Sequence, residues 1–257
     1  MLKKYSILFL MLCIFISGCT NSHIIINNIN DLEGKKVGIY TGSEYNQILS
    51  QKIKNAIPTY YNSYTDEVMA LKSGKIDAFL ADEPLAKEIL KNFSDLKILD
   101  SYLTNDSYAF AVNPKKENLQ KEINSTIELM TDDGTLEKMK EKWFGNNEDK
   151  KNLEKYDCSN CNKSLKFATV AGSAPFAYMK NNEIVGYDID IINYIGAKLG
   201  YKIEIIEMAF DGIIPALKSG KVDVAGCSII VTEERKKSVL FSLPNYTGGI
   251  VIITRKD

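Results

Sequence analysis

The sequence predicts an α/β protein built of two similar lobes, and three features of the 257-residue chain lead to this prediction. Strand-like apolar runs alternate with helix-period stretches along most of the chain, which is typical of α/β folds. The segment ALKSGKIDA at residues 70–78 recurs almost unchanged as ALKSGKVDV at 216–224. Between the two copies, residues 146–163 are polar and lack apolar periodicity, so we predict a linker there.

The strands are predicted where short apolar runs are bounded by turn-forming residues. In chain order they are residues 36–40, 76–80, 109–112, 166–170, 202–206, 222–227 and 250–254. The helices are predicted where apolar residues recur every three or four positions, several of them before a glycine that can form a left-handed cap. They are residues 45–53, 66–72, 84–91, 118–130, 136–143, 188–199 and 212–218.

The repeated segment has the pattern of a last helical turn, a glycine cap and a buried strand. Its two copies lie much too far apart for the period of a solenoid. We therefore interpret them as equivalent parts of two similar lobes.

The composition is that of an ordinary globular protein, with 45% hydrophobic and 25% charged residues. The 32 basic residues nearly balance the 33 acidic ones, which gives a formal net charge of -1. We find no dense block of lysine and arginine. Nucleic acid is therefore not expected as a partner.

Residues 1–18 have the layout of a secretory signal peptide. Lys3 and Lys4 precede an apolar run at 5–16 that is too short to span a bilayer comfortably. The sequence Ile-Ser-Gly-Cys that follows resembles the lipobox of bacterial lipoproteins, which implies a lipid on Cys19 and a tether at 19–29. An uncleaved anchor or a chance cysteine is the alternative. In either case we expect the folded part outside the cytoplasm, and a lipid on Cys19 would anchor it at the cell membrane.

The other cysteines differ in their expected roles. Cys13 leaves with the signal peptide, whereas Cys158, Cys161 and Cys227 stay in the folded part. A zinc site needs about four ligands, and the CxxC pair has no second pair beside it and only His23 as a possible imidazole. We therefore expect no metal and no cofactor. A Cys158–Cys161 disulfide suits an oxidising compartment, with a pair of free thiols as the alternative.

Several motifs resemble the bacterial family 3 extracellular solute-binding proteins, which serve ABC importers of polar amino acids. In the C-terminal half they are VGYDID at 185–190, FDGIIPALKSGKVD at 210–223 and TEERKK at 232–237. In the N-terminal half they are LEGKKVG at 32–38, ADEP at 81–84, DGTL at 133–136 and EKWFG at 141–145. The resemblance covers nearly all of residues 30–257. It implies a periplasmic-binding-protein-like type II fold, in which two α/β lobes close over a ligand like a Venus flytrap.

The order of these motifs differs from that of the family, where the Gly-Tyr-Asp-Ile-Asp portion comes first and the Trp-Phe-Gly helix last. The chain thus resembles a circular permutant, with the family's first lobe at 164–257 and its second lobe at 30–113, and we keep these two names. Residues 114–145 would run back to the first lobe and pack on it the helix that is C-terminal in the family. Residues 146–163 would join the family's termini at little entropic cost, and the new chain ends would fall at a hinge strand. A truncated tandem array is the alternative.

The resemblance also implies which residues contact the ligand. A free amino acid presents a carboxylate and an ammonium, so its site needs a planar donor fork and a fixed anion. Arg235 aligns with the arginine that grips the carboxylate, and Asp82 with the aspartate of the opposite lobe that accepts from the ammonium. The carbonyl of Ser228 would meet the same ammonium. The alternatives are a surface arginine in the basic turn 235–237 and a helix N-cap aspartate before Pro84.

Further candidates line the expected walls of this site. The segment Gly-Ser-Glu at 42–44 opens a helix whose free N–H groups could meet the carboxylate, although Ser43 could equally be a plain N-cap. Phe210 aligns with an aromatic that stacks on ligand side chains, with a core position as the alternative. Tyr40 and Tyr45 fall on the second-lobe wall or on its rim. The complete candidate set is Tyr40, Gly42, Ser43, Glu44, Asp82, Ser173, Phe210, Cys227, Ser228, Ile230 and Arg235.

Four positions depart from the family pattern and narrow the expected ligand. Val170 replaces an aspartate found in members with basic ligands, and Ser173 replaces an aromatic residue. Ile230 replaces a hydroxyl residue whose hydrogen bond to the ammonium would be worth about 1.5–3 kcal/mol. Glu44 replaces a threonine and would disfavour an acidic ligand. We therefore expect a neutral polar, amino-acid-like ligand.

The resemblance implies a binding protein that delivers its ligand to an ABC permease in the membrane. A zwitterion would satisfy Arg235 and Asp82 together only when the lobes are closed, so the ligand would favour closure. We do not expect an enzyme, because no Ser/His/Asp set is present and His23 lies in the tether. A ligand-sensing receptor domain and a degenerate pair of lobes that binds nothing are the alternatives.

Overall fold

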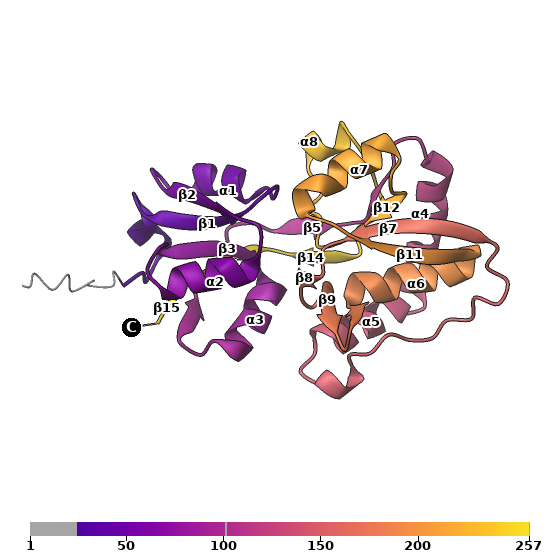
Figure 1. Ribbon diagram of the computed structural model, residues 1–257, viewed down its shortest axis with the longest axis horizontal. Helices are drawn as coiled ribbons and strands as arrows, with labels where there is room; N and C mark the ends of the chain where they lie inside the picture. Colours follow the sequence, from indigo (N-terminus) through magenta and orange to yellow (C-terminus); the bar gives the residue numbers. More distant parts are fainter. Residues whose placement is uncertain (1–24, 101, 257) are drawn as a thin grey trace, which may run out of the picture.

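The protein is described by a computed structural model that covers residues 25–100 and 102–256. The predicted signal peptide, the predicted lipidation site Cys19 and the imidazole of His23 lie outside the described residues. Two α/β lobes lie side by side in Figure 1, the second lobe on the left and the first lobe on the right. The predicted α/β fold of two lobes is therefore confirmed.

The second lobe contains a five-stranded sheet with helices on both faces. Its strands, in spatial order, are β2 (Ile57–Tyr61), β1 (Lys36–Tyr40), β3 (Ala78–Asp82), β15 (Ile250–Arg255) and β4 (Leu96–Ile98). The first three are parallel, and β15 is antiparallel to both of its neighbours. The helical segments are η1 (Ile29–Leu32), α1 (Tyr45–Lys52), α2 (Tyr64–Lys72) and α3 (Glu83–Asn92).

The central strands of this sheet are buried on both faces, which explains their unbroken apolar sequences. Alternate residues of β3 point to opposite faces. Ala78 and Leu80 pack with α1, whereas Phe79 and Ala81 pack with α2 and α3. Because β1 and β3 are parallel neighbours, their carboxyl ends meet at one edge of the sheet, as in other open parallel sheets.

The first lobe repeats this plan. Its sheet has the order β11 (Tyr201–Glu207), β7 (Lys163–Thr169), β12 (Val224–Ala225), β6 (Ala111–Val112) and β13 (Leu240–Phe241). A hairpin sheet of β8 (Gly172–Ser173), β9 (Ala177–Lys180) and β10 (Glu183–Val185) lies beside it. The helical segments are α4 (Glu117–Asp132), α5 (Thr135–Phe144), η2 (Glu148–Lys150), α6 (Tyr187–Leu199), η3 (Phe210–Gly212), α7 (Ile213–Ser219) and α8 (Glu233–Lys236).

Helix α5 packs in the first lobe through Trp143, which is fully buried. The indole Nε1 of Trp143 donates a hydrogen bond to Asp190 of α6 at 2.8 Å. Tyr156 of the linker donates to the other oxygen of the same carboxylate, also at 2.8 Å. The buried aspartate thus ties the α5 helix, the linker and α6 together.

Each sheet is completed by a strand from the other half of the chain, because β15 joins the second lobe and β6 joins the first. The two crossing segments pair with each other between the lobes, as β5 (Asp106–Tyr108) and β14 (Tyr246–Gly248). We expected the first lobe to extend to residue 257 and the chain to end at a hinge strand. Instead, the last strand, β15, follows the crossing segment and belongs to the sheet of the second lobe. Both crossing segments are continuous, and β15 supplies the backbone partners that β3 and β4 need.

The repeated segment has the same structure in both lobes. Asp77 accepts a hydrogen bond from the N–H of Lys36 at 3.0 Å, and Asp223 accepts one from the N–H of Lys166 at 2.8 Å. In each lobe the aspartate is therefore held against the neighbouring parallel strand, at the first residue of β1 and in the middle of β7. This structural role accounts for the repeated Lys-Ile/Val-Asp sequence.

Strand β2 is not predicted from the sequence, because Pro58 lacks an N–H and argues against a strand. It lies at the edge of its sheet, where proline is tolerated. Strands β4, β8, β9, β10, β13 and β14 have two to four residues each, which is too short for a recognisable period.

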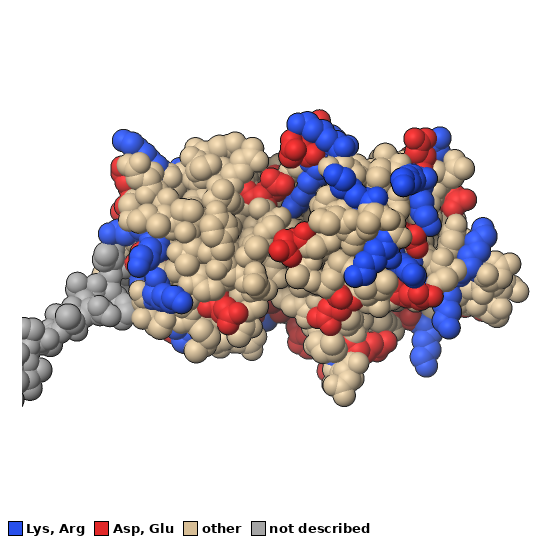
Figure 2. Space-filling view, turned by 45° about the horizontal axis from the view of Figure 1, so that its top comes forward, with Lys and Arg blue, Asp and Glu red and all other residues tan. Residues whose placement is uncertain are grey.

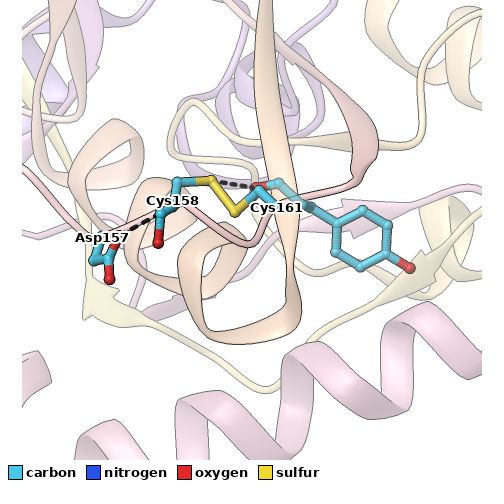
Figure 3. The surroundings of a disulfide bond; sticks show 5 residues. Asp157, Cys158 and Cys161 are labelled. Carbon is cyan, nitrogen blue, oxygen red and sulfur yellow. Dashed lines mark hydrogen bonds between the residues drawn. A yellow bond between two sulfur atoms is a disulfide. The ribbon is translucent and has the colours of Figure 1, made fainter.

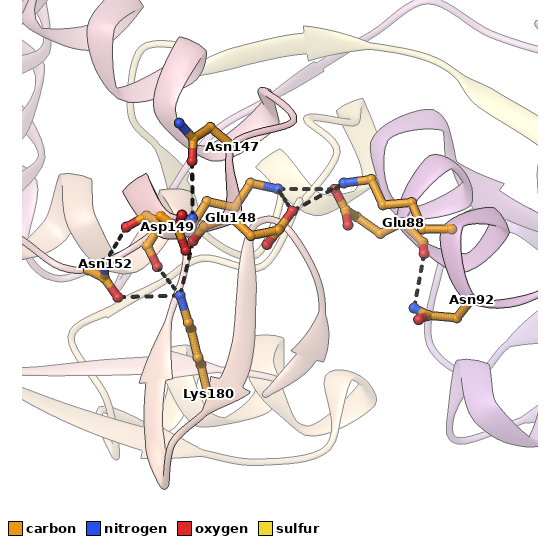
Figure 4. Close-up of polar contacts among 9 residues, drawn as sticks. Glu88, Asn92, Asn147, Glu148, Asp149, Asn152 and Lys180 are labelled. Carbon is orange, nitrogen blue, oxygen red and sulfur yellow. Dashed lines mark hydrogen bonds and ion pairs between the residues drawn. The ribbon is translucent and has the colours of Figure 1, made fainter.

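The linker is held against the first lobe at two places. The structure pairs Cys158 with Cys161 in a disulfide (Figure 3), and Cys158 Sγ lies 3.7 Å from the carbonyl oxygen of Tyr201. On the other side of the linker, Lys180 of β9 donates to the carbonyl of Lys151 at 2.8 Å (Figure 4). Residues 148–151 thereby keep a fixed position on the first lobe.

Four charged side chains join this part of the linker to α3 of the second lobe. Lys151, which is only 2% exposed, lies 2.8 Å from Glu148 and 3.3 Å from Glu88. Lys91 lies 2.7 Å from Glu88 and 3.3 Å from Glu148. We call these four residues the latch (Figure 4). The latch connects the two lobes away from the hinge strands.

Candidate functional site

A small cavity lies between the two lobes. It forms where the carboxyl ends of β1 and β3 face the loops of the first lobe. Its lining residues are Tyr40, Ser43, Glu44, Tyr45, Tyr64 and Asp82 from the second lobe, and Ser173, Phe210, Cys227, Ser228, Ile230 and Arg235 from the first. The structure therefore brings the predicted candidates together, with Gly42 directly behind the lining.

Arg235 reaches the cavity from α8 and is 8% exposed, so it is not a surface arginine. Its backbone N–H donates to the N-cap Thr232 at 3.2 Å. Its Nη1 donates to the carbonyl of Ile230 at 3.0 Å, and Nη2 to the carbonyl of Gly42 on the opposite lobe at 3.2 Å. Nε lies 3.2 Å from Glu44 Oε1. Burial lowers the pKa of Arg235, and the nearby Glu44 carboxylate acts in the opposite direction.

Asp82 ends β3 and faces Arg235 from the opposite lobe. It stands at the N-cap position of α3, but its side chain makes no cap hydrogen bond. It accepts instead from the Tyr108 hydroxyl at 2.9 Å. Burial raises the pKa of Asp82 to about 6, although hydrogen bonds from Ser228, Tyr108 and Tyr45 lower it. The side chain is therefore aimed at the cavity and the hinge, which does not match a plain N-cap.

Asp188 lies behind the cavity and was not among the predicted site residues. It accepts from the N–H of Ser228 and from the side chain of Asn245, both at 3.2 Å. Burial raises the pKa of Asp188 to about 7. Ser228 has a φ of 46°, which is unusual for a residue with a side chain. Asp188 thus holds the strained backbone of Ser228 in place, and its position in the VGYDID motif was the available sequence signal.

Aromatic rings form one wall of the cavity. Tyr40 stacks on Tyr64 with ring centroids 4.5 Å apart and meets the edge of Phe210 at 5.9 Å. The hydroxyls of Tyr45 and Tyr64 are 3.2 Å apart. The Arg235 guanidinium lies 5.5 Å from the centre of the Phe210 ring. Sequence reasoning missed Tyr64, because its position at the start of a helix gives no signal of a wall residue.

The loop between β1 and α1 comes very close to the first lobe. Gly42 has a φ of 83°, and a Cβ there would lie 2.7 Å from the Cα of Asp211. Only glycine fits this position without a shift. Ser43 donates to the carbonyl of Tyr40 at 2.6 Å and accepts from the N–H of Tyr45 at 3.3 Å. Ser43 therefore stabilises the turn, while the N-cap position itself belongs to Glu44.

Cys227 is buried and lies 3.6 Å from the carbonyl of Val170. Burial raises the pKa of the Cys227 thiol to about 12, so it stays protonated at neutral pH. Ser173, in the β8–β9 hairpin, lines the same part of the wall. Both side chains contribute shape and weak polar contacts to the cavity.

Residues 25–100 and 102–256 contain neither a metal-binding cluster nor a membrane-spanning helix. No group of three or more His, Cys, Asp or Glu side chains there could hold a metal ion. No helix in the same residues is long and apolar enough to cross a membrane. On the face drawn in Figure 2, acidic and basic side chains are interspersed over the first lobe.

The two lobes exchange strands and enclose a cavity, which has a buried arginine on one side and a buried aspartate on the other. This arrangement defines a bilobal binding protein. The sequence model of one protein family, the bacterial extracellular solute-binding proteins, family 3, matches residues 27–146 and 165–257. The chain belongs to this family, and its fold is the type II fold of periplasmic binding proteins.

Individual relatives match over part of the chain. It is 40% identical over 95 residues to the arginine-binding extracellular protein ArtP of Bacillus subtilis, covering 37% of each chain. It is 33% identical over 121 residues to the L-cystine-binding protein TcyJ of Escherichia coli, covering 47% of this chain and 46% of that relative. The arginine-bound domain 1 of TmArgBP is 34% identical with a TM-score of 0.33, covering 40% of this chain and 87% of the domain. The chain thus spans less than half the length of these two curated relatives.

Proposed function

We propose that the chain is an extracytoplasmic, lipid-anchored protein that binds a small amino-acid-like solute and delivers it to an ABC permease. The observation that carries this proposal is the cavity between the lobes, with Arg235 on one wall and Asp82 on the other. Family membership and the arginine-, histidine- and cystine-binding relatives support it.

The proposed mechanism is closure of the lobes over the ligand. The ligand carboxylate binds the Arg235 guanidinium, and its ammonium binds Asp82 and the backbone of Ser228. These groups belong to different lobes, so a zwitterion satisfies both only in the closed form and shifts the hinge equilibrium toward it. The paired crossing segments β5 and β14 are where the lobes would rotate.

We propose a neutral polar ligand. Glu44 points its carboxylate at Arg235, so an additional acidic group in the ligand would meet a like charge. Val170 and Ser173 provide no carboxylate for a basic side chain. The tyrosine hydroxyls and the Ser173 and Ser228 side chains offer hydrogen bonds to an uncharged polar group.

We further propose that the chain is a circular permutant of its family. The family model matches it in two separate segments, and residues 147–164 between them remain unmatched. The exchange of β6 and β15 between complete five-stranded sheets supports this proposal, because one set of each lobe folds together.

A thermal-shift screen of residues 23–257 against the amino acids and cystine tests the function. A ligand that binds the folded state raises its melting temperature by mass action. We expect a clear rise with one or two neutral polar amino acids. A cooperative melt that none of them shifts would refute the proposed ligand class.

The lipid anchor has its own test. Cys19→Ser in the full chain, expressed in a bacterium that processes lipoproteins, should move the protein from the membrane fraction to the soluble extracytoplasmic fraction. Unchanged membrane association of this variant would contradict lipidation at Cys19.

A further inference from the structure

The Glu44 carboxylate forms an ion pair with Arg235 within the protein itself. Its Oε1 lies 3.2 Å from Nε of Arg235, and the two residues come from opposite lobes. Nη1 and Nη2 of Arg235 donate to the carbonyls of Ile230 and Gly42. All three guanidinium nitrogens therefore have partners within the chain. The side chain expected to grip the ligand is already satisfied by a carboxylate.

The charges that line the cavity are unequal. Arg235 is the one Lys or Arg among the lining residues, whereas Glu44 and Asp82 are both carboxylates. Asp188 lies directly behind Ser228. When a ligand carboxylate takes the Nε donor of Arg235, Glu44 loses its ion-pair partner. A partly buried carboxylate without a donor is costly.

Among residues 25–100 and 102–256, the Glu44 carboxylate has Arg235 as its one recorded ion-pair partner. It occupies the N-cap position of α1, but its side chain makes no cap hydrogen bond. The neighbouring Ser43 and Gly42 shape the turn and the close approach to Asp211. The side chain of Glu44 is therefore available to the cavity.

We propose that Glu44 determines ligand specificity by competing with the ligand carboxylate for Arg235. This inference rests on the proposed function and deepens it. A ligand whose side chain carries an amide or hydroxyl donor gives the displaced Glu44 a new partner and binds well. An apolar side chain leaves Glu44 without a donor, and an acidic side chain meets it as a like charge.

The same contact favours closure of the empty protein. The Glu44–Arg235 pair and the Gly42 carbonyl both join the lobes without a ligand. A ligand can shift the hinge equilibrium only by its differential affinity for the closed form. Glu44 thus lowers the apparent affinity for every ligand that carries a carboxylate.

The test is Glu44→Gln, which keeps the shape and removes the charge. Titration calorimetry of the wild-type protein with glutamine, glutamate, asparagine, aspartate and leucine should give the amides the highest affinity. In the variant, the preference for each amide over its acid should shrink at least about tenfold, because like-charge repulsion is removed. Glu233→Gln on α8 is the control, since that carboxylate is 87% exposed and pairs with Lys236.

An unchanged amide-to-acid ratio in Glu44→Gln, or a wild-type preference for leucine or glutamate, would overturn the assignment. A second measurement needs no ligand. Small-angle scattering of the ligand-free proteins should show a larger radius of gyration for Glu44→Gln than for wild type and Glu233→Gln. If no amino acid binds the wild type, the proposed ligand class fails, while equal radii would still reject the role of Glu44 as a bridge between the lobes.

Discussion

Arg235 is the residue on which ligand binding most depends. Arg235→Ala should weaken binding of the ligand at least about 30-fold, because losing one partner of a buried charged contact costs about 2–5 kcal/mol. Titration calorimetry with the ligand found by thermal shift measures the loss. The Arg235→Lys variant should also bind weakly, since an ammonium cannot reproduce the bidentate contact of a guanidinium with the ligand carboxylate.

The control for this substitution is Lys236→Ala on the same helix, whose side chain is half exposed and pairs with Glu233. It should bind like the wild type. Circular dichroism should show that Arg235→Ala remains folded, because Arg235 lies at the cavity between the lobes and outside the hydrophobic cores. Wild-type affinity in a folded Arg235→Ala protein would disprove the site assignment.

The two buried carboxylates make binding sensitive to pH. Burial raises the pKa of Asp82 to about 6, and the groups that face it are Tyr108 of β5, Tyr45 of α1, Ser228, Asp106 and Asp188. An ammonium needs the ionised carboxylate. Ligand affinity should therefore fall as the pH is lowered through about 6, measured by calorimetry between pH 5 and 8. Asp82→Asn should bind weakly and lose this dependence.

Stability of the ligand-free protein should change in the opposite direction. Asp82 and Asp188 have folded-state pKa values of about 6 and 7, above the ordinary value of 3.8. Between these values the folded state binds more protons than the unfolded state, so its stability falls as the pH rises. The melting temperature should drop from pH 5 to pH 8. A melting temperature that rises over this range, or does not change, would contradict the buried placement of both groups.

At the scale of the element, the Cys158–Cys161 disulfide closes a very short loop in the linker. Short loops remove little entropy from the unfolded chain, so replacing both cysteines by serine should lower the free energy of unfolding by about 2 kcal/mol or less. Guanidinium unfolding of the oxidised wild type and the double variant measures this. Ligand affinity should be unchanged, since neither cysteine lines the cavity. A large loss of affinity would assign the linker a direct role at the site.

At the scale of the whole molecule, the latch should stabilise the closed form together with the ligand. Lys151→Met keeps most of the buried volume and removes the charge shared by Glu88 and Glu148. We expect affinity to fall several-fold, corresponding to about 1 kcal/mol, because the two carboxylate partners of the buried Lys151 are themselves partly exposed to solvent. Calorimetry at low and high salt should show this difference at low salt and a smaller one at high salt.

The neighbouring Lys150 provides a matched control for the latch. It is exposed, stands one residue away in the linker, and has no described ion pair with α3. Lys150→Met should bind like the wild type at every salt concentration. Equal affinities for Lys150→Met and Lys151→Met would show that the latch does not contribute to closure.

The local sequence was sufficient to place most of the secondary structure. Runs such as residues 36–40 and 202–206 are strands within one residue of their predicted bounds. The first lies inside its sheet and is almost entirely buried, whereas the second is an edge strand in which apolar and charged residues alternate. Strand β2 was missed, because only its place at the sheet edge makes Pro58 acceptable. The final strand was assigned to the first lobe but completes the sheet of the second lobe, because an apolar run does not specify which sheet it completes.

By itself the sequence determined the α/β class, the repeated lobes, the family, and the chemical types that line the cavity. These depend on periodicity and on local motifs, which each segment carries independently. Only the tertiary structure decided that β6 and β15 exchange between lobes, that Asp188 supports Ser228, and that Glu44 pairs with Arg235. Each of these is a contact between residues distant in the chain, and such contacts are set by how the two lobes pack rather than by any single segment.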